Sequence, residues 1–338
     1  MNKKTQITLQ DIAVELNVTK VTVSKALRDH PDISKEKTEL VKETARKMGY
    51  YPNFAARNLS SKKTNTIGVI VPVIANNFFA QVIESIYDYA FKNDYEIILA
   101  VSQEDSERER KHLETMLSMR VDGIMISLTE HSSNMDMFRK IKKMGVPLVF
   151  FDRVPNMKAI NSVTVDNVLG AFIAVEQAIN KGYKEIGFLA GYDDINIGRE
   201  RMEGFNKALE KYKIKKNNKW IIHAGYSKAD GYNGFMELHK RGNIPEFIFA
   251  VTFPVALGVY CAAEELGLKI PTDFDILCFG NSNINKYLKP SLSCIDQDAD
   301  ELARQSVDSI FNIINSTASI RAKEIKITPK LIIRETCI

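Results

Sequence analysis

Apolar positions in the first fifty residues recur at the spacing of three short amphipathic helices. Thr8, with an acid three residues later, forms a capping-box pattern that predicts the start of the first helix. Thr19 predicts the N-cap of a second helix over 20–27, and a third is expected from Ser34 to just before Gly49. The expected inward positions are Ile12, Ala13, Leu16, Val23, Ala26, Leu27, Leu40, Val41, Ala45 and Met48.

Two short helices joined by a tight turn, with the small residue Ala13 where they can cross, are typical of a helix-turn-helix. Such motifs present the N-terminal residues of their second helix to the major groove of DNA. Polar groups able to bond bases or phosphates lie on or beside this helix, at Lys20, Thr22, Ser24, Lys25 and Arg28. A small packing domain of three amphipathic helices is the alternative interpretation of the same pattern.

The distribution of charge favours a nucleic-acid partner for this segment. Residues 1–63 carry 13 Lys or Arg and 7 Asp or Glu, whereas the rest of the chain carries 33 and 35. A basic head on a slightly acidic body is expected of a protein whose head contacts a polyanion. A solvated surface without a partner explains the charge alone equally well, so the prediction of DNA binding depends on charge and helix pattern together.

A short basic segment follows the three helices. Asn53 predicts an N-cap after Pro52, but the helix would run only about two turns, and isolated helices below about 12–15 residues are marginal in water. Residues 61–66 have the composition of a flexible tether. Leu59 has no evident core, so three placements stay open: in a DNA minor groove, on a partner subunit, or on the neighbouring lobe.

From residue 66 the pattern alternates between buried strands and amphipathic helices. Residues 184–191 echo residues 65–72, so the pattern restarts there. We therefore expect an α/β core of two doubly wound parallel-sheet lobes, with a ligand cleft at the carboxyl ends of the strands. The expected strands are 67–72, 97–101, 123–127, 147–151, 184–191, one near 221, 247–252 and 274–279. The expected helices are 79–93, 104–119, 135–144, 199–212, 229–241 and 256–266.

Several motifs, in this order along the chain, resemble those of the lactose/galactose repressor family of bacterial regulators, whose core is similar to periplasmic binding proteins. These motifs are Leu9-Gln10-Asp11-Ile12-Ala13, Val18-Thr19-x-x-Thr22-Val23-Ser24, Gly49-Tyr50-x-Pro52-Asn53, Lys62-x-Thr64-x-x-Ile67-Gly68-Val69, Arg120-Val121-Asp122-Gly123-Ile124 and Asp152-Arg153. The resemblance covers essentially the whole chain. The domains expected from it are a helix-turn-helix over 1–52, a hinge over 53–65, a first lobe over 66–163 and 296–325, and a second lobe over 164–295 and 326–338.

The resemblance implies a homodimer that binds a pseudo-palindromic operator of double-stranded DNA and acts as a repressor. In this family hinge helices form on the operator, and the resemblance gives Leu59 the role of a wedge in the central minor groove. The complete set of DNA contacts expected is Thr19, Lys20, Val21, Thr22, Ser24, Lys25, Asn53, Arg57 and Leu59. No heptad repeat follows Cys337, so we expect a dimer rather than a tetramer.

The resemblance also implies a small-molecule effector in the cleft, a sugar or a derivative of one. The effector residues expected are Asn76, Phe78, Phe79, Asp152, Arg153, Arg201, Thr252, Phe253, Asn281 and Gln297. Thr252-Phe253 stands where the family commonly has Asn-Asp, and Phe279-Gly280-Asn281 where it commonly has Phe-Asp-Asp. The loss of these polar groups favours an uncharged or anionic ligand, or a protein corepressor in place of a sugar.

Three simpler interpretations compete at single positions. Phe78 and Phe79 suit plain core aromatics, and Asp152-Arg153 suits a surface ion pair. The charged run 104–111 is interpreted as a solvated helix start without a function.

Two other classes of protein fit the sequence less well. An exported sugar-binding protein has no DNA-binding head, and the N-terminus here has no apolar run of signal-peptide length. An enzyme is disfavoured because the five His are scattered and no phosphate-binding glycine motif is present. The four Cys form no C-x-x-C pair, so we expect reduced thiols in a cytoplasmic protein with no metal, cofactor or membrane span.

Overall fold

The structure is a computed structural model, and it describes residues 7–51, 63–242, 244–316 and 321–338. The chain divides into two compact units, Met1–Thr64 and Asn65–Ile338, which we call the head and the core. The boundary falls inside residues 61–66, where the sequence has the composition of a tether.

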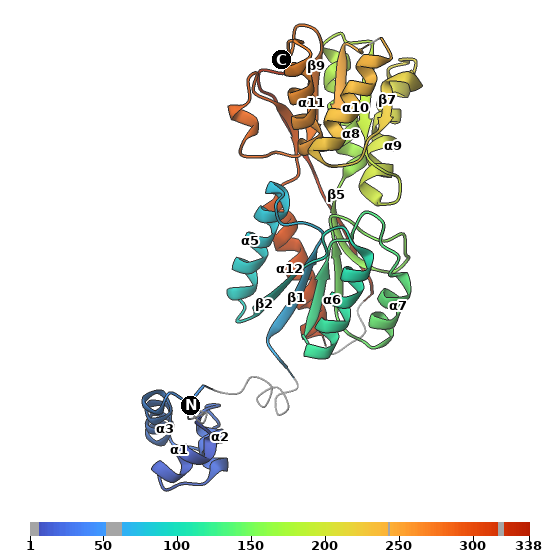
Figure 1. Cartoon of the computed structure of the whole chain (residues 1–338). Coiled ribbons are helices and arrows are strands. Elements are labelled where there is room, and N and C mark those ends of the chain that lie inside the picture. Colours follow the sequence, from blue (N-terminus) through green and yellow to red (C-terminus); the bar gives the residue numbers. More distant parts are fainter. Residues whose placement is uncertain (1–6, 52–62, 243, 317–320) are drawn as a thin grey trace. The chain divides into compact units, whose positions relative to one another are not determined.

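Three helices form the described part of the head (Figure 1): α1 (Leu9–Glu15), α2 (Lys20–Ala26) and α3 (Lys35–Met48). Each helix begins after a capping side chain, because an oxygen of Thr8, Thr19 or Ser34 accepts a hydrogen bond from the backbone N–H three residues later. Gly49 ends α3 in the left-handed conformation, with φ of 70°. The predicted helices and caps of the head are therefore confirmed.

The head has its own small core. The buried apolar side chains in it are Ile12, Ala13, Val23, Ala26, Val41 and Ala45. The expectation that Leu40 is buried is wrong, because half of its surface is exposed. Thr38 is buried instead, since positions 38, 41 and 45 follow the three- and four-residue spacing of one helix face.

The first lobe of the core is a parallel sheet with helices on both faces (Figure 1). Its strands are β1 (Thr66–Val71), β2 (Glu96–Val101), β3 (Gly123–Ile126), β4 (Leu148–Phe151), β5 (Asn161–Val165) and β11 (Glu324–Ile327), in the order β11-β5-β4-β3-β1-β2. Its helices are α5 (Asn77–Phe91), α6 (Ser106–Met119), α7 (Met135–Lys143) and α12 (Ala299–Asn315). All six residues of β1 are buried, as its unbroken apolar sequence predicts.

The second lobe repeats this plan. Its strands are β6 (Ile186–Ala190), β7 (Ile221–His223), β8 (Phe247–Ala250), β9 (Asp275–Phe279), β10 (Ser293–Asp296) and β12 (Lys330–Ile332), in the order β12-β10-β9-β8-β6-β7. Its helices are α8 (Asn167–Asn180), α9 (Asn196–Lys211), α10 (Lys228–Lys240) and α11 (Phe253–Glu265), with single turns at Asn218–Trp220 and Asn285–Tyr287. Only the edge strand β12 runs antiparallel to its neighbour among the described strands. The predicted fold class is confirmed.

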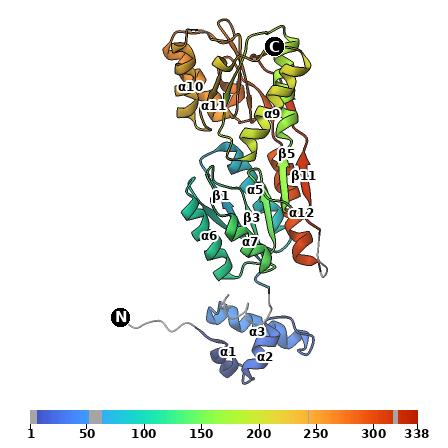
Figure 2. The same cartoon turned by 90° about the vertical axis from the view of Figure 1, so that its right-hand side faces the viewer.

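Six elements have no counterpart among the predicted ones: α8, α12, β5, β10, β11 and β12. Helix α8 is apolar on most of its surface and packs against both α9 and the sheet, so it lacks the polar face that marks a surface helix. Strand β11 has the alternating sequence Glu-Ile-Lys-Ile at a sheet edge, but with four residues it is too short to give a clear strand signal. Figure 2 shows β5 and β11 side by side at this edge, next to α12.

The described chain passes between the lobes in three places: after β5, after β10 and after β11. These segments contact one another, because the backbone N–H of Asp166 donates to the carbonyl oxygen of Ile327 at 2.9 Å. Lys330 also forms an ion pair with Asp298 at 2.9 Å. Three short connecting segments that are bonded to one another in this way form a suitable hinge between two rigid lobes.

Candidate functional site

The N-terminal turn of α2 presents side chains to solvent in the head. Val21 is 63% exposed, and Lys20 is exposed beside it. The hydroxyls of Thr19 and Thr22 lie 2.9 Å apart, and Thr19 also caps the helix. An exposed apolar side chain between polar ones at a helix start is a surface able to contact base edges, including a thymine methyl group.

Two of the predicted DNA contacts, Lys25 and Ser24, form hydrogen bonds within the head. Lys25 forms an ion pair with Asp32, with 2.5 Å between Nζ and Oδ2, and this contact lowers the pKa of the Asp32 carboxyl. The Arg28 guanidinium donates to the carbonyl and hydroxyl oxygens of Ser24, at 3.0 and 3.1 Å. Lys25 must therefore leave an exposed acid before it can donate to a base. The remaining predicted contacts, Asn53, Arg57 and Leu59, lie outside the described residues.

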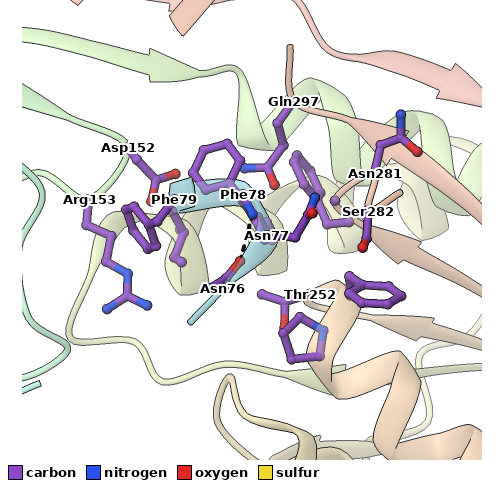
Figure 3. A pocket seen from close by; sticks show the side chains of 16 residues that line it. Asn76, Asn77, Phe78, Phe79, Asp152, Arg153, Thr252, Asn281, Ser282 and Gln297 are labelled. Atoms are coloured by element: carbon purple, nitrogen blue, oxygen red, sulfur yellow. Dashed lines mark hydrogen bonds between the residues drawn. The ribbon is translucent and has the colours of Figure 1, made fainter. Parts of the chain in front are cut away.

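A cavity of about 50 Å³ lies between the two lobes of the core, at the carboxyl ends of β1, β4, β8 and β9 (Figure 3). All ten predicted effector residues line it. The other lining residues are Asn77, Ile197, Pro254, Phe279, Gly280 and Ser282. Most of them are sequence neighbours of predicted residues, so the strand-to-helix loops that carry the motifs contain the signal that would find them.

The cavity is too small for a whole sugar in the observed arrangement. A volume of about 50 Å³ holds about four water molecules, and pockets for small organic ligands measure about 300–1,000 Å³. Entry of a sugar-sized ligand therefore requires the lobes, or wall side chains such as Phe78 and Phe253, to move apart.

Aromatic side chains from the start of α5 form one wall of the cavity (Figure 3). Asn76 caps this helix by accepting a hydrogen bond from the Phe78 backbone N–H at 2.9 Å. Phe79 is 2% exposed and packs edge-on to Phe78, which is only half-buried. Phe79 is thus largely a core residue, which agrees with the simpler interpretation of this position. Phe78 presents a face to the cavity.

Arg153, from the first lobe, is buried and has a carboxylate partner. Its Nη1 donates to both carboxyl oxygens of Glu104, at 2.8 and 3.0 Å. Burial alone would lower the pKa of Arg153, but the charges of Glu104 and Asp152 outweigh that effect and raise it. The interpretation of Asp152-Arg153 as a surface ion pair is wrong, because both residues are 5% exposed and Arg153 bonds to Glu104.

The charged run 104–111 is not merely a solvated helix start. Glu109 is completely buried, and it accepts hydrogen bonds from the Thr129 backbone N–H at 2.8 Å and from the Asn134 amide at 2.9 Å. Together with Glu104 it anchors the loop after β3 and the side chain of Arg153. Neither glutamate has a local sequence signal for this role, because their partners lie 20 to 49 residues away along the chain.

Arg201, at the first turns of α9, is 1% exposed and has neutral hydrogen-bond acceptors. Its Nε donates to Asn167 Oδ1 at 3.0 Å, and its Nη1 donates to the carbonyl oxygen of Val251 at 2.5 Å. The guanidinium stacks 3.6 Å from the centroid of the Phe279 ring. Burial lowers the pKa of Arg201 to about 10, although the charge of Asp152 acts in the opposite direction.

The second lobe supplies no carboxylate to the cavity wall. Gly280 has φ of 107°, which disfavours other residues, and a Cβ there would lie 3.3 Å from Gln297 Oε1. The Asn281 side-chain oxygen accepts a hydrogen bond from Arg334 at 2.9 Å, so a contact within the fold fixes the position of this amide. Thr252 caps α11 and donates to the Tyr226 carbonyl oxygen at 3.1 Å.

Asn196 joins the lobes beside the cavity. Its side-chain oxygen accepts from the Val154 backbone N–H, and its amide donates to the Asp152 carbonyl oxygen, each at 3.0 Å. A hydrogen bond between the His131 ring and the Asp194 carboxylate also crosses from one lobe to the other. Asn196 begins α9 after β6, much as Asn77 begins α5 after β1, so the internal repeat could have indicated it.

Comparison with known proteins agrees with both units of this structure. Residues 8–53 match the family described as bacterial regulatory proteins, lacI family, and residues 67–318 match the periplasmic binding protein domain. The chain is 32% identical over 330 residues to the NTD biosynthesis operon regulator NtdR of Bacillus subtilis (strain 168), covering 97% of this chain and 99% of that protein. The chain belongs to the lacI family of bacterial regulatory proteins.

Other members of the lacI family are similar over most of their length. Catabolite control protein A of Priestia megaterium is 33% identical over 295 residues, covering 86% of this chain and 87% of that protein. The solved structure of the transcription regulator CcpA of Lactococcus lactis has a TM-score of 0.74 at 28% identity, and covers 80% of this chain and 98% of that one. The Lac repressor dimer bound to operator and the anti-inducer ONPF has the same fold, with a TM-score of 0.88 at 24% identity over 98% and 99% of the two chains.

Two further features of this lacI-family chain concern the described residues alone. None of their helices has the length and apolar content needed to cross a membrane. They also contain no group of three or more His, Cys, Asp or Glu side chains placed to hold a metal ion. The proteins similar to this chain are transcription regulators, which agrees with the expectation that it is not an enzyme.

Proposed function

We propose that this chain is a sequence-specific transcription repressor that reads DNA with α2 and is controlled by a small molecule bound between the lobes of its core. The observation that carries the proposal is the convergence of all ten predicted effector residues on one cavity, in a chain that also carries a capped helix-turn-helix. Similarity over nearly the whole length to NtdR, a regulator of an operon, supports it.

Regulation follows from linkage between the cleft and the operator. A ligand that changes the angle between the lobes alters the distance between the two first lobes of a dimer, and so the separation of the hinges that lead to the heads. Ligand and operator then share one coupling free energy, typically about 1–3 kcal/mol. Leu59 at the hinge is the proposed minor-groove wedge, and the domain limits expected from the sequence remain part of this proposal.

A sugar or a derivative of one is the proposed class of effector. The half-buried ring of Phe78 supplies an apolar surface, and Asp152 and Gln297 supply polar groups around it (Figure 3). Control by a protein corepressor is the second candidate, and the small volume of the cavity is the observation that favours it. A small molecule that stabilises the purified chain in the absence of any other protein would favour a small-molecule effector over a protein corepressor.

The DNA-binding half of the proposal is tested by selection from a library of random double-stranded sequences with the full chain. We expect an inverted repeat to be enriched, because two copies of α2 in a dimer read two half-sites. Binding of all sequences alike, with affinity governed only by salt, would contradict the proposal.

Lys25→Ala should relax the preference at one base position per half-site, with a loss of about 1–3 kcal/mol of discrimination. Asp32→Asn is the matched variant, because it releases Lys25 from its acid without removing the lysine. It should tighten operator binding and keep the same consensus. A uniform loss for Lys25→Ala across all sequences would make Lys25 a phosphate contact only.

A further inference from the structure

We propose that the cleft recognises a small organic anion, whose carboxylate or phosphate group is bound on the second-lobe side next to Arg201. This inference rests on the proposed function, because it takes the cleft to be the effector site.

The first argument is the buried charge of Arg201. A buried cation is expensive unless a carboxylate or another anion neutralises it. Arg153 has such a partner in Glu104, whereas the hydrogen bonds of Arg201 go to a side-chain amide oxygen and a backbone carbonyl oxygen. An anionic ligand would give Arg201 the charge partner that the second lobe does not supply.

The second argument is the balance of hydrogen-bond donors and acceptors in the wall. Several acceptor oxygens already receive a hydrogen bond from the fold. Asn76 Oδ1 accepts from Phe78, Asn281 Oδ1 from Arg334, and Ser282 Oγ from the Ile284 backbone. The amide nitrogen of Asn77 is buried and has no hydrogen-bond partner among the described residues. This unpartnered donor in the wall suits a ligand group rich in acceptor oxygens.

The third argument is the position of the carboxylate in the wall. Asp152 lies with Arg153 at one end of the cavity, while Asn281 and Ser282 lie at the other (Figure 3). Burial raises the pKa of Asp152, so its charge is already disfavoured. A ligand anion placed toward Asn281 avoids this carboxylate, and neutral hydroxyl groups of the ligand can face it.

The experiment measures the affinity of the full chain for matched series of compounds by calorimetry. The glucose, galactose and mannose series each contain the neutral sugar, its uronate and its phosphate. A fourth series pairs ribose with ribose 5-phosphate. Acetate and inorganic phosphate are included as bare anions. We expect at least one charged member to bind ten-fold or more tightly than its neutral parent, and the uronate and phosphate arms distinguish the two sources of charge.

A variant locates the charged group. Asn281→Asp keeps the oxygen that accepts from Arg334 but adds a negative charge to the second-lobe wall. It should weaken binding of the charged ligand at least ten-fold more than binding of the neutral parent, because only the charged ligand is repelled by the added carboxylate. Asn233→Asp, an exposed position on α10, makes the same chemical change away from the cavity and should alter neither affinity.

Three outcomes would overturn the inference: neutral parents that bind as tightly as their acids and phosphates, no binding by any charged compound, or an affinity that Asn281→Asp does not change. Selection of operator DNA with the same protein separates this failure from a failure of the proposed function. If an inverted repeat is selected while no anion binds, the regulator stands and only the charge of its ligand is wrong.

Discussion

The two lobes share one fold, yet they supply the cleft with arginines in opposite situations. Arg153 of the first lobe is neutralised by Glu104, and its pKa is raised. Arg201 of the second lobe is stacked on Phe279 and bonded to neutral oxygens, and burial lowers its pKa to about 10. Two side chains of the same type, both buried, thus differ only in the partner that the fold provides.

The two lobes therefore have different roles in the cleft. Arg153 is neutralised within the first lobe, because it bonds to Glu104, while the neighbouring Glu109 holds the loop after β3. The second lobe leaves a charge without an acid, which costs stability and is useful only if a ligand supplies the counter-charge.

The largest expected effect separates the two arginines by stability. Arg153→Met leaves Glu104 without its cation beside the cavity, and we expect a loss of about 3 kcal/mol in the free energy of unfolding. Arg201→Met removes a charge that has no acid partner and leaves two neutral acceptors, so its loss should be about 1 kcal/mol. Urea titration of both variants measures the difference.

Equal losses in the free energy of unfolding of the two variants would contradict the proposed difference between the lobes. Arg201→Met should nevertheless abolish the response to ligand in operator-binding measurements, and the ligand-free affinity for operator should stay at its original value. A purely structural role of Arg201 would not produce a variant that stays stable and yet no longer responds to ligand.

A second variant tests the contact that joins the lobes. Asn196→Ala removes both hydrogen bonds to the first-lobe backbone and leaves two buried polar groups without partners, so we expect a loss of about 1–3 kcal/mol. Ligand affinity should fall as well, because the closed arrangement of the lobes is disfavoured. Asn233→Ala on the surface of α10 serves as control. Equal losses of stability and ligand affinity in this control would contradict a specific role of Asn196 in joining the lobes.

The smallest expected effect is a change in the pH dependence of stability. Asp152 has a raised pKa in the folded chain, so its ionisation opposes folding at neutral pH, and this cost disappears as the pH falls below the ordinary value of 3.8. Asp152→Asn should therefore raise Tm at pH 7 and have little effect near pH 3.5. Asn suits the left-handed backbone at this position, where φ is 57°.

An advantage for Asp152→Asn that persisted unchanged at low pH would point to packing rather than to charge. Thermal unfolding of both proteins between pH 3.5 and 8 measures this directly. Ser227→Ala, which removes a helix cap at a residue that does not line the cavity, should lower Tm by a similar amount across the range.

Local signals in the sequence were sufficient for much of the fold. The caps at Thr8 and Thr19 could be predicted because a capping side chain bonds to a residue only three positions away. The buried strand β1 could be predicted because its run of apolar residues is continuous. Helix α8 could not be predicted in this way, because it is apolar on most of its surface and has no amphipathic pattern to detect.

The chemistry of the cleft was only partly accessible from the sequence. The family resemblance implied the ten predicted effector residues, and the structure brings them to one cavity. The pairing of Arg153 with Glu104 and the contacts of Asn196 join segments 42 to 49 residues apart, so no local pattern records them. The orphan amide of Asn77 likewise becomes visible only when every neighbour is in place.

The most direct test of the central claim is a titration of the selected operator with the full chain, with and without a saturating amount of the ligand identified by calorimetry. We predict that the ligand changes operator affinity by about 5- to 150-fold, and that Arg201→Met abolishes this change. An operator affinity that stays the same at saturating ligand would contradict the account, because the cleft and the head would then be two independent binding sites on one chain.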